Sequence, residues 1–125
     1  MADAWQSRPE RPVAAPLQHI RLSEEIERLK HEPTWRTGDR NAITLTKEPA
    51  LRVVLIALKQ NAKLHEHQAG GPVTIQAVSG LLRVTIVGLA LDLRPGEIAV
   101  LESAIDHEVE ALEEATLLLT LVKPT

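Results

Sequence analysis

The chain contains no cysteine, no phenylalanine and no tyrosine, and its only tryptophans are Trp5 and Trp35. Without cysteine it has neither a disulfide framework nor thiol chemistry of its own, which agrees with a reducing compartment. Few aromatic side chains and no run of lysine or arginine leave it without the stacking platforms and basic patches that bind nucleic acids. We therefore expect no nucleic-acid partner.

Long apolar runs are also missing. The most apolar stretches are interrupted by Arg52, Arg83 and Asp92, well short of the roughly 20 apolar residues that a membrane-spanning helix needs. The first 16 residues lack the apolar region of a secretory signal. We expect a cytoplasmic protein without a membrane partner.

What remains is an aliphatic chain of 125 residues with a net charge of −3, the length of one domain. Residues 1–16 are rich in proline and show no periodicity, which predicts a flexible arm. Residues 17–41 form a helical segment in which Ser23 is the expected N-cap and Pro33 the expected stop. The helix Ser23–Lys30 has one apolar face, which should pack on the remainder of the domain.

Residues 42–125 change to short runs of β-branched and aliphatic residues separated by turn residues such as Gly70-Gly71-Pro72. Runs this short and this close leave no room for the helices of a parallel sheet, so they indicate an all-β sandwich or barrel. The expected strands are 42–46, 51–59, 73–78, 81–87, 89–93, 98–101, 107–112 and 115–122.

Histidines carry the main chemical signal. His65 and His67 stand two apart, so in a strand both side chains project to the same face, with backbones about 7 Å apart. Two imidazoles placed in this way can bind one metal ion if another strand supplies a third ligand, and His107 is the remaining histidine of the β region. His19 and His31 lie in the N-terminal segment and are poor candidates. An isolated H-x-H pair is more often simply solvated.

Two stretches, LHEHQAGGPVTIQAVSG and LRPGEIAVLESAIDHEVEAL, resemble the two motifs of a single-domain cupin of the RmlC-like superfamily. The first motif, G-x5-H-x-H-x3/4-E-x6-G, is matched at His65, His67 and Gly80. The second, G-x5-P-x-G-x2-H-x3-N, is matched at Gly96 and His107. The resemblance covers about residues 42–122 and implies a jelly-roll β-barrel, or double-stranded β-helix, which the short helix expected from the sequence pattern precedes.

The chain departs from both motifs. Lys59 takes the opening glycine position, and Asn61 beside it can adopt the left-handed conformation that a turn requires. Val73 takes the position of the glutamate, so the family's carboxylate ligand is absent. In the second motif the proline, glycine and asparagine positions hold Glu102, Ala104 and Ala111.

The resulting hypothesis is a divalent-metal site with His65, His67 and His107 as ligands. Gln76 is a weaker fourth candidate, because an unbroken strand would point it away from the face of Val73. Neutral imidazoles would leave the ion its full charge and an open position, which favours a small anionic ligand. Imidazole donors suit Fe, Zn, Ni or Cu, with Mn a further candidate. The resemblance implies a dioxygenase or an isomerase, and no catalytic side chain stands out.

Two other interpretations remain open. Val73 in the glutamate position favours a metal-free barrel that binds or senses a small ligand, with the histidines making only hydrogen bonds. An interaction module that docks through the helix Ser23–Lys30 is the third. In each case we expect a homodimer, because pairing between two copies covers open sheet edges.

Overall fold

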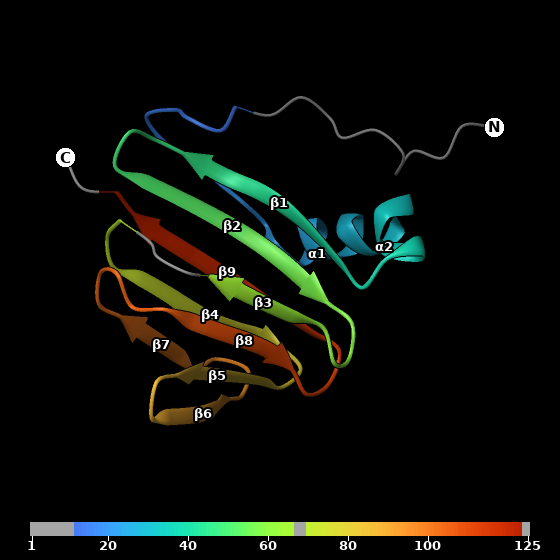
Figure 1. Cartoon of the computed structure of the whole chain (residues 1–125). Coiled ribbons are helices and arrows are strands. Elements are labelled where there is room, and N and C mark those ends of the chain that lie inside the picture. Colours follow the sequence, from blue (N-terminus) through green and yellow to red (C-terminus); the bar gives the residue numbers. More distant parts are fainter. Residues whose placement is uncertain (1–11, 67–69, 124–125) are drawn as a thin grey trace.

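The computed structural model describes residues 12–66 and 70–123, which form two facing antiparallel sheets with two short helices on one side (Figure 1). No helix in this part of the chain is long and apolar enough to cross a membrane. The helices are α1 (Leu22–His31) and α2 (Pro33–Thr37). The strands are β1 (Arg40–Lys47), β2 (Leu51–Leu58), β3 (Lys63–Glu66), β4 (Val73–Ser79), β5 (Leu82–Ile86), β6 (Leu89–Leu93), β7 (Ile98–Leu101), β8 (His107–Ala111) and β9 (Ala115–Val122).

The strands divide into a five-stranded sheet of order β1-β2-β9-β4-β7 and a four-stranded sheet of order β3-β8-β5-β6. All pairings are antiparallel, and neighbours such as β2 and β9 are far apart in sequence, as in a jelly roll. The all-β expectation is confirmed. Each strand expected from the sequence is present within a few residues, and β3 is an additional strand around His65.

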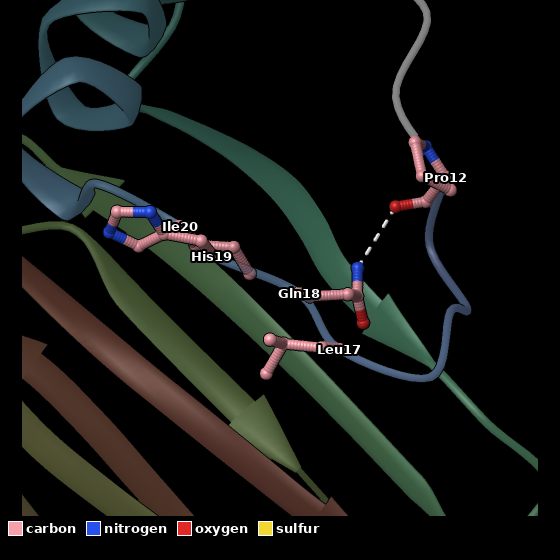
Figure 2. Close-up of a pocket in the computed structure, with 5 residues that line it drawn as sticks. All are labelled: Pro12, Leu17, Gln18, His19 and Ile20. Atoms are coloured by element: carbon pink, nitrogen blue, oxygen red, sulfur yellow. Dashed lines mark hydrogen bonds between the residues drawn. The ribbon is translucent and has the colours of Figure 1, made fainter.

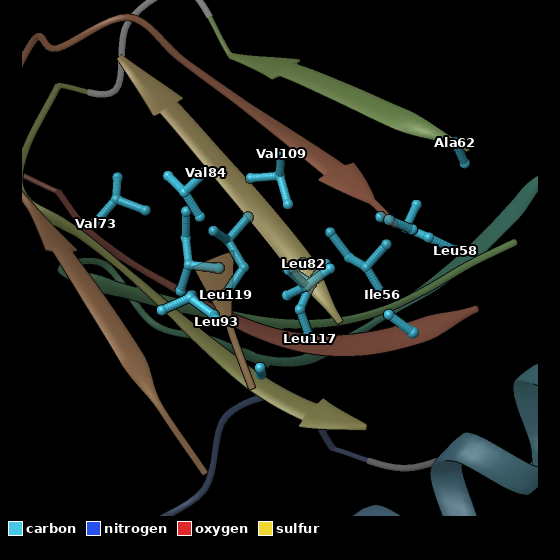
Figure 3. Packing of buried hydrophobic residues seen from close by; sticks show 14 of the residues in the cluster. Ile56, Leu58, Ala62, Val73, Leu82, Val84, Leu93, Val109, Leu117 and Leu119 are labelled. Carbon is cyan, nitrogen blue, oxygen red and sulfur yellow. The ribbon is translucent and has the colours of Figure 1, made fainter. Parts of the chain in front are cut away.

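The core lies between the two sheets and is almost entirely aliphatic (Figure 3). It follows from strict alternation: Val73, Ile75 and Ala77 of β4 are buried, whereas Thr74 and Gln76 between them are only partly covered. The sheets meet through inward-facing residues that include Leu82, Val84, Leu93, Val109, Leu117 and Leu119. Burying one such side chain stabilises the fold by about 1.5–3 kcal/mol.

The helices form a second core against the outer face of β1 and β2. Leu29 of α1 and Trp35 of α2 are buried against Ile43, Leu45 and Leu55. The ammonium groups of two lysines lie over the Trp35 ring, at 5.9 Å for Lys30 and 5.1 Å for Lys59. The amphipathic helix expected from the sequence therefore packs on its own barrel.

The start of α1 differs from the prediction. Arg21 is the N-cap and no side chain caps the helix, so the predicted Ser23 cap is wrong, since Ser23 lies inside the first turn. The helix does end before Pro33, at His31. Pro33 then begins α2, a one-turn helix that the sequence pattern did not predict, because proline suits the first helical position as well as it stops a helix.

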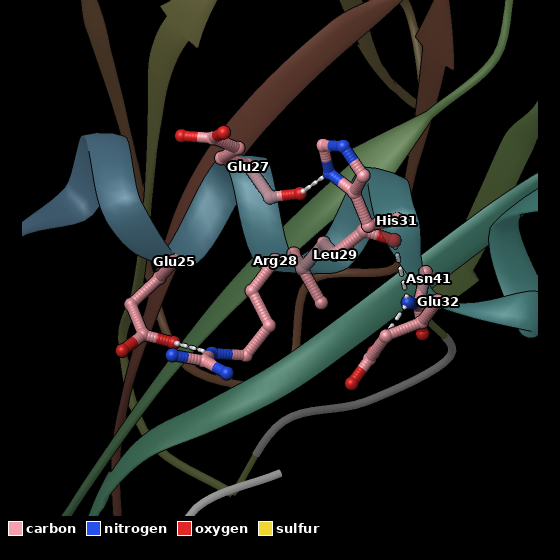
Figure 4. A network of polar contacts seen from close by, with 7 residues as sticks. All are labelled: Glu25, Glu27, Arg28, Leu29, His31, Glu32 and Asn41. Atoms are coloured by element: carbon pink, nitrogen blue, oxygen red, sulfur yellow. Dashed lines mark hydrogen bonds and ion pairs between the residues drawn. The ribbon is translucent and has the colours of Figure 1, made fainter. Parts of the chain in front are cut away.

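A buried polar network joins the end of α1 to β1 (Figure 4). The Asn41 side-chain amide donates to the Leu29 carbonyl at 2.9 Å and to the Glu32 carboxylate at 2.8 Å. Its oxygen accepts from the Ala42 backbone N–H at 3.0 Å. Asn41 and Glu32 are both buried, so these bonds satisfy a carbonyl that the helix end would otherwise leave unpaired.

The segment ahead of α1 covers the free edge of β1. The Lys47 backbone N–H donates to the Val13 carbonyl at 2.7 Å. The Gln18 amide donates to the carbonyls of Pro12 and Leu45 and accepts from the Thr46 hydroxyl. Figure 2 shows Gln18 beside a hollow of about 190 Å³ that Leu17, His19 and Ile20 also line. Because β1 is an edge strand, this segment shields backbone groups that could otherwise pair with another chain.

Two turns show why particular residues occupy the cupin-like motifs. Gly80 has φ +78°, and a Cβ there would lie 2.1 Å from the Glu114 carbonyl oxygen. Asn61 has φ +74°, which confirms the left-handed conformation expected beside Lys59. Position 80 therefore requires glycine for two reasons: its backbone angle is left-handed, and a neighbouring segment leaves no room for a Cβ.

We predict that Gly80→Ala destabilises the protein by more than about 3 kcal/mol, since the left-handed angle alone costs about 1–2 kcal/mol and the clash adds to it. Gly88→Ala is the matched control, because Gly88 has φ +77° with no atom near its Cβ position. Gly88→Ala should lower the free energy of unfolding by only about 1–2 kcal/mol, which is the cost of the left-handed angle. Urea unfolding of both variants measures the difference, and equal losses would contradict the close approach at Gly80.

Candidate functional site

The candidate site lies where β3 and β5 end and β8 begins. The β3–β8 register pairs His65 with Glu108, and the β5–β8 register pairs Thr85 with Glu108. A hollow of about 340 Å³ opens at these strand ends, a volume suited to a small molecule. Its lining combines residues of both faces of the sheet: His65, Thr85, Ile86, Val87, Asp106, His107 and Glu108.

His107 occupies the inner face of the four-stranded sheet. It is 3% exposed and shares its face with the buried Val109 and Ala111. Its Nδ1 lies 3.2 Å from the Ile105 carbonyl oxygen. Since a carbonyl can only accept, Nδ1 carries the hydrogen, and in the neutral ring Nε2 is the acceptor. Nε2 is buried and has no hydrogen-bond partner among the described residues, a state that costs about 1–3 kcal/mol.

His65 faces the other way. In β8, His107 and Val109 are buried, so Glu108 between them points to the outer face of the sheet. His65 is the Cα partner of Glu108 and therefore lies on the same outer face, where its side chain is 53% exposed. Its Nδ1 is 3.7 Å from a Glu108 carboxylate oxygen, and the Lys63 ammonium is 3.9 Å from the other oxygen. The structure thus brings His65 and His107 to one hollow but to opposite faces of the sheet.

The weaker fourth candidate, Gln76, is not brought to His107 either. Gln76 pairs with Ile98 and lies on the face of β4 opposite to Val73, outside the space between the sheets. Val73 itself, at the family's glutamate position, is buried in the core at 2% exposure. His67 lies outside the described residues.

The described histidines, His65 and His107, do not form a metal centre by themselves, and the three-histidine set stays a prediction because it includes His67. Among residues 12–66 and 70–123, no three His, Asp or Glu side chains lie close enough together to hold an ion. His107 offers one buried nitrogen donor, whereas a catalytic zinc-type site uses three protein ligands.

The outer face of the four-stranded sheet is a charged, solvated surface. Arg83 of β5 pairs with Asp92 of β6, with Nε 2.8 Å from a carboxylate oxygen. This hydrogen bond holds the pKa of Asp92 below its usual value. Glu108 and Glu110 lie on the same face, beside Lys63 and Arg83. Arg83 is paired with Asp92, and Lys63 and His65 lie beside Glu108. This exposed face is therefore better suited to water than to a ligand.

The inner face opens progressively toward one corner. At the far end of the barrel, Leu82 and Leu93 are buried at 0% and 4% exposure. One step nearer the site, Val84 is still buried at 4%, but its partner Leu91 is 40% exposed. At the site end, Leu89 pairs with the partly buried Ile86 and is 56% exposed. The space between the sheets is therefore open at the end of β5 and the start of β6, which we call the β5–β6 corner.

The sequence pattern did not predict this corner. Leu89, Leu91 and Leu93 alternate with Ala90 and Asp92, so the pattern assigns all three leucines equally to the interior. No local signal distinguishes a leucine under a facing sheet from one beyond its edge. Asp106 stands at a variable position of the second cupin-like motif, so the motif gave it no role either.

Comparisons with known proteins bear on the fold. No protein-family model and no curated protein sequence matches the chain significantly. Among solved structures, a cupin 2 conserved barrel domain protein from Leptotrichia buccalis is 29% identical, with a TM-score of 0.65 over 69% of this chain and 42% of its own. A cupin-2 domain protein from Shewanella frigidimarina is 12% identical, with a TM-score of 0.66 over 83% of this chain and 94% of its own.

An enzyme also resembles the chain. A variant of salicylate 1,2-dioxygenase from Pseudoaminobacter salicylatoxidans aligns with a TM-score of 0.75 over 90% of this chain, at 17% identity. This chain spans only 36% of that enzyme, so the likeness concerns the barrel and not the reaction. The order of the two antiparallel sheets and these likenesses together show that the chain has the fold of a small cupin domain.

Proposed function

We propose that this cupin binds a small molecule between its sheets, with His107 as the polar group that orients it. The observation that carries the proposal is the buried Nε2 of His107, which has no partner among the described residues and lies beside a hollow of about 340 Å³. Buried polar atoms in proteins rarely lack a hydrogen-bond partner. Where no protein atom serves as the partner, a ligand, an ion or a water commonly does.

The chemistry of the site favours binding over catalysis. Nε2 accepts a hydrogen bond, so a matching ligand carries an O–H or N–H donor. The surrounding inner face is aliphatic and would contact the rest of the ligand without reacting with it. The two carboxylates of the hollow, on Asp106 and Glu108, are exposed or partly exposed. This supports the metal-free, ligand-binding interpretation of the sequence.

A divalent metal ion (Fe, Zn, Ni, Mn or Cu) is the second candidate occupant, and the same unpaired nitrogen supports it, together with the H-x-H spacing of His65 and His67. Such an ion would supply Lewis-acid chemistry for a small anionic substrate, as an isomerase requires. A dioxygenase would need a redox-active ion such as Fe. The outward position of His65 counts against this set of ligands.

We also propose that the protein is a homodimer. The free edge of β1 is covered by the segment at Val13, whereas β7 is an edge strand whose Ile98 and Val100 are 54% and 71% exposed on the outer face. Uncharged apolar residues on an open edge favour pairing with a second copy.

His107→Leu tests whether the buried imidazole lacks a partner within the protein, as a ligand-binding role requires. Replacing an unpaired buried imidazole by an apolar side chain should raise the free energy of unfolding by about 1 kcal/mol, because the unsatisfied acceptor is removed. His65→Leu, at an exposed position, should change it by less than about 0.5 kcal/mol. Urea unfolding measures both, and a large loss in His107→Leu would mean that the imidazole already has its partner.

Metal loading separates the two candidate occupants. The parent protein and the His65→Ala, His67→Ala and His107→Ala variants are each incubated with one metal salt, dialysed and measured by elemental analysis. We expect far less than one ion per chain in all four proteins. One ion per parent chain that is lost in both His67→Ala and His107→Ala would overturn the metal-free proposal in favour of the second candidate.

Val100→Glu tests the dimer. A charge on the exposed face of β7 should convert a dimer to a monomer in analytical ultracentrifugation, because pairing would bury it. Ala90→Glu, on the exposed outer face of β6, is the control and should leave the dimer intact. A monomeric parent protein would contradict the proposal directly.

A further inference from the structure

The leucines of β6 have an environment that core packing does not explain. Leu89, Leu91 and Leu93 all lie on the inner face of the four-stranded sheet, opposite Ile86, Val84 and Leu82 in the β5–β6 register. Leu93 is 4% exposed, but Leu91 is 40% and Leu89 56% exposed. Two large apolar side chains therefore face the interior and still meet solvent, which is unfavourable for apolar surface.

Leu89 lies beside Ile86, which lines the hollow at His107. Thr85 pairs with Glu108, and continuing this register by one residue sets Ile86 next to His107. Since Ile86 also pairs with Leu89, the row across the inner face runs from His107 through Ile86 to Leu89. Neighbouring strands are about 4.8 Å apart, so this row is about 10 Å long.

A second hollow extends this surface. It has a volume of about 310 Å³ and is lined by Ile86, Val87, Ala104, Ile105 and Asp106. Three of these residues, Ile86, Val87 and Asp106, also line the hollow at His107, so the two hollows adjoin. Val87, which lines both hollows, is 96% exposed, and Ile105 of the second hollow is 37% exposed. Apolar side chains open to solvent therefore line the joined surface beside the Asp106 carboxylate.

From this continuity we infer that the β5–β6 corner admits the ligand and binds its apolar body, while the ligand's single hydroxyl group reaches Nε2 of His107. Leu89 and Leu91 would then determine specificity. The inference rests on the proposed function and names its ligand class: a neutral aliphatic or aromatic alcohol about 10 Å long.

The charges around the site select a neutral ligand. Its titratable groups are His65, Asp106, His107 and Glu108. The exposed carboxylate of Asp106 has no ion pair within the described residues, and Glu108 is shared by Lys63 and His65, so the hollow disfavours an anion. An ammonium group at His107 would leave water for an aliphatic interior without a buried counter-charge, which is costly.

The test uses three probes of matched length: 1-octanol, octanoate and heptyl methyl ether, which lacks the donor. Each is titrated into the ¹⁵N-labelled full chain, and amide and imidazole NMR signals are followed. Octanol should shift the amides of β5, β6 and residues 104–107 together with the Nε2 signal of His107. The ether and octanoate should bind at least about tenfold more weakly.

Substitution of the two leucines tests whether they contact the apolar part of the ligand. Leu89→Ser combined with Leu91→Ser should weaken octanol binding by about tenfold, and because both positions are already exposed the fold should survive, as dispersed amide signals would show. Leu17→Ser is the control: Leu17 is 87% exposed and lies outside the site, so its loss should leave binding unchanged.

The possible failures are distinguishable. Octanoate binding more tightly than octanol at the same amides, or octanol binding unaffected by the two serines, would overturn the ligand class or the corner while leaving the site at His107 in place. No shift at His107 with any probe would contradict the proposed function as well. Shifts at β6 that depend on protein concentration instead of probe concentration would assign the corner to a second copy of the chain.

Discussion

The pairing register of β8 with its neighbours is the constraint on which the site depends. Because side chains alternate along a strand, this register decides that His107 and Val109 face the aliphatic interior and that Glu108 and Glu110 face solvent. A shift by one residue would place two carboxylates in the core and expose the imidazole. The packing of Val84 and Val109 against the facing sheet fixes the register, so the same contacts that stabilise the barrel also set the orientation of the buried imidazole.

The sequence predicted most of the scaffold. Alternating apolar runs, turn residues and the cupin-like spacing located the strands and the all-β class, and Asn61 adopts the backbone angle that its position required. Ala104, which replaces the motif's glycine, has φ +61°, an angle that the sequence did not predict for an alanine. The predicted features are local, since a turn or a strand is encoded by a few consecutive residues, and local patterns are what a single sequence displays.

The arrangement of the site could not be predicted from local sequence patterns. His65 and His107 are separated by about forty residues, and whether they share a face depends on how β3 and β8 pair, which neither strand encodes alone. The exposure of Leu89 has a similar origin, because it depends on where the facing sheet ends. Motif spacing places residues along the chain, but it does not report the face on which each side chain lies.

The cover over β1 has a consequence for how the chain tolerates shortening. Val13 and Gln18 occupy backbone groups that the edge strand would otherwise present to solvent. A version of the protein that begins at α1 would keep the core between the sheets, lose Ile20 from the second core, and expose the eight residues of β1 to strand addition by another chain. The segment ahead of α1 thus shields this edge strand from pairing with other chains, and we expect its removal to promote such pairing.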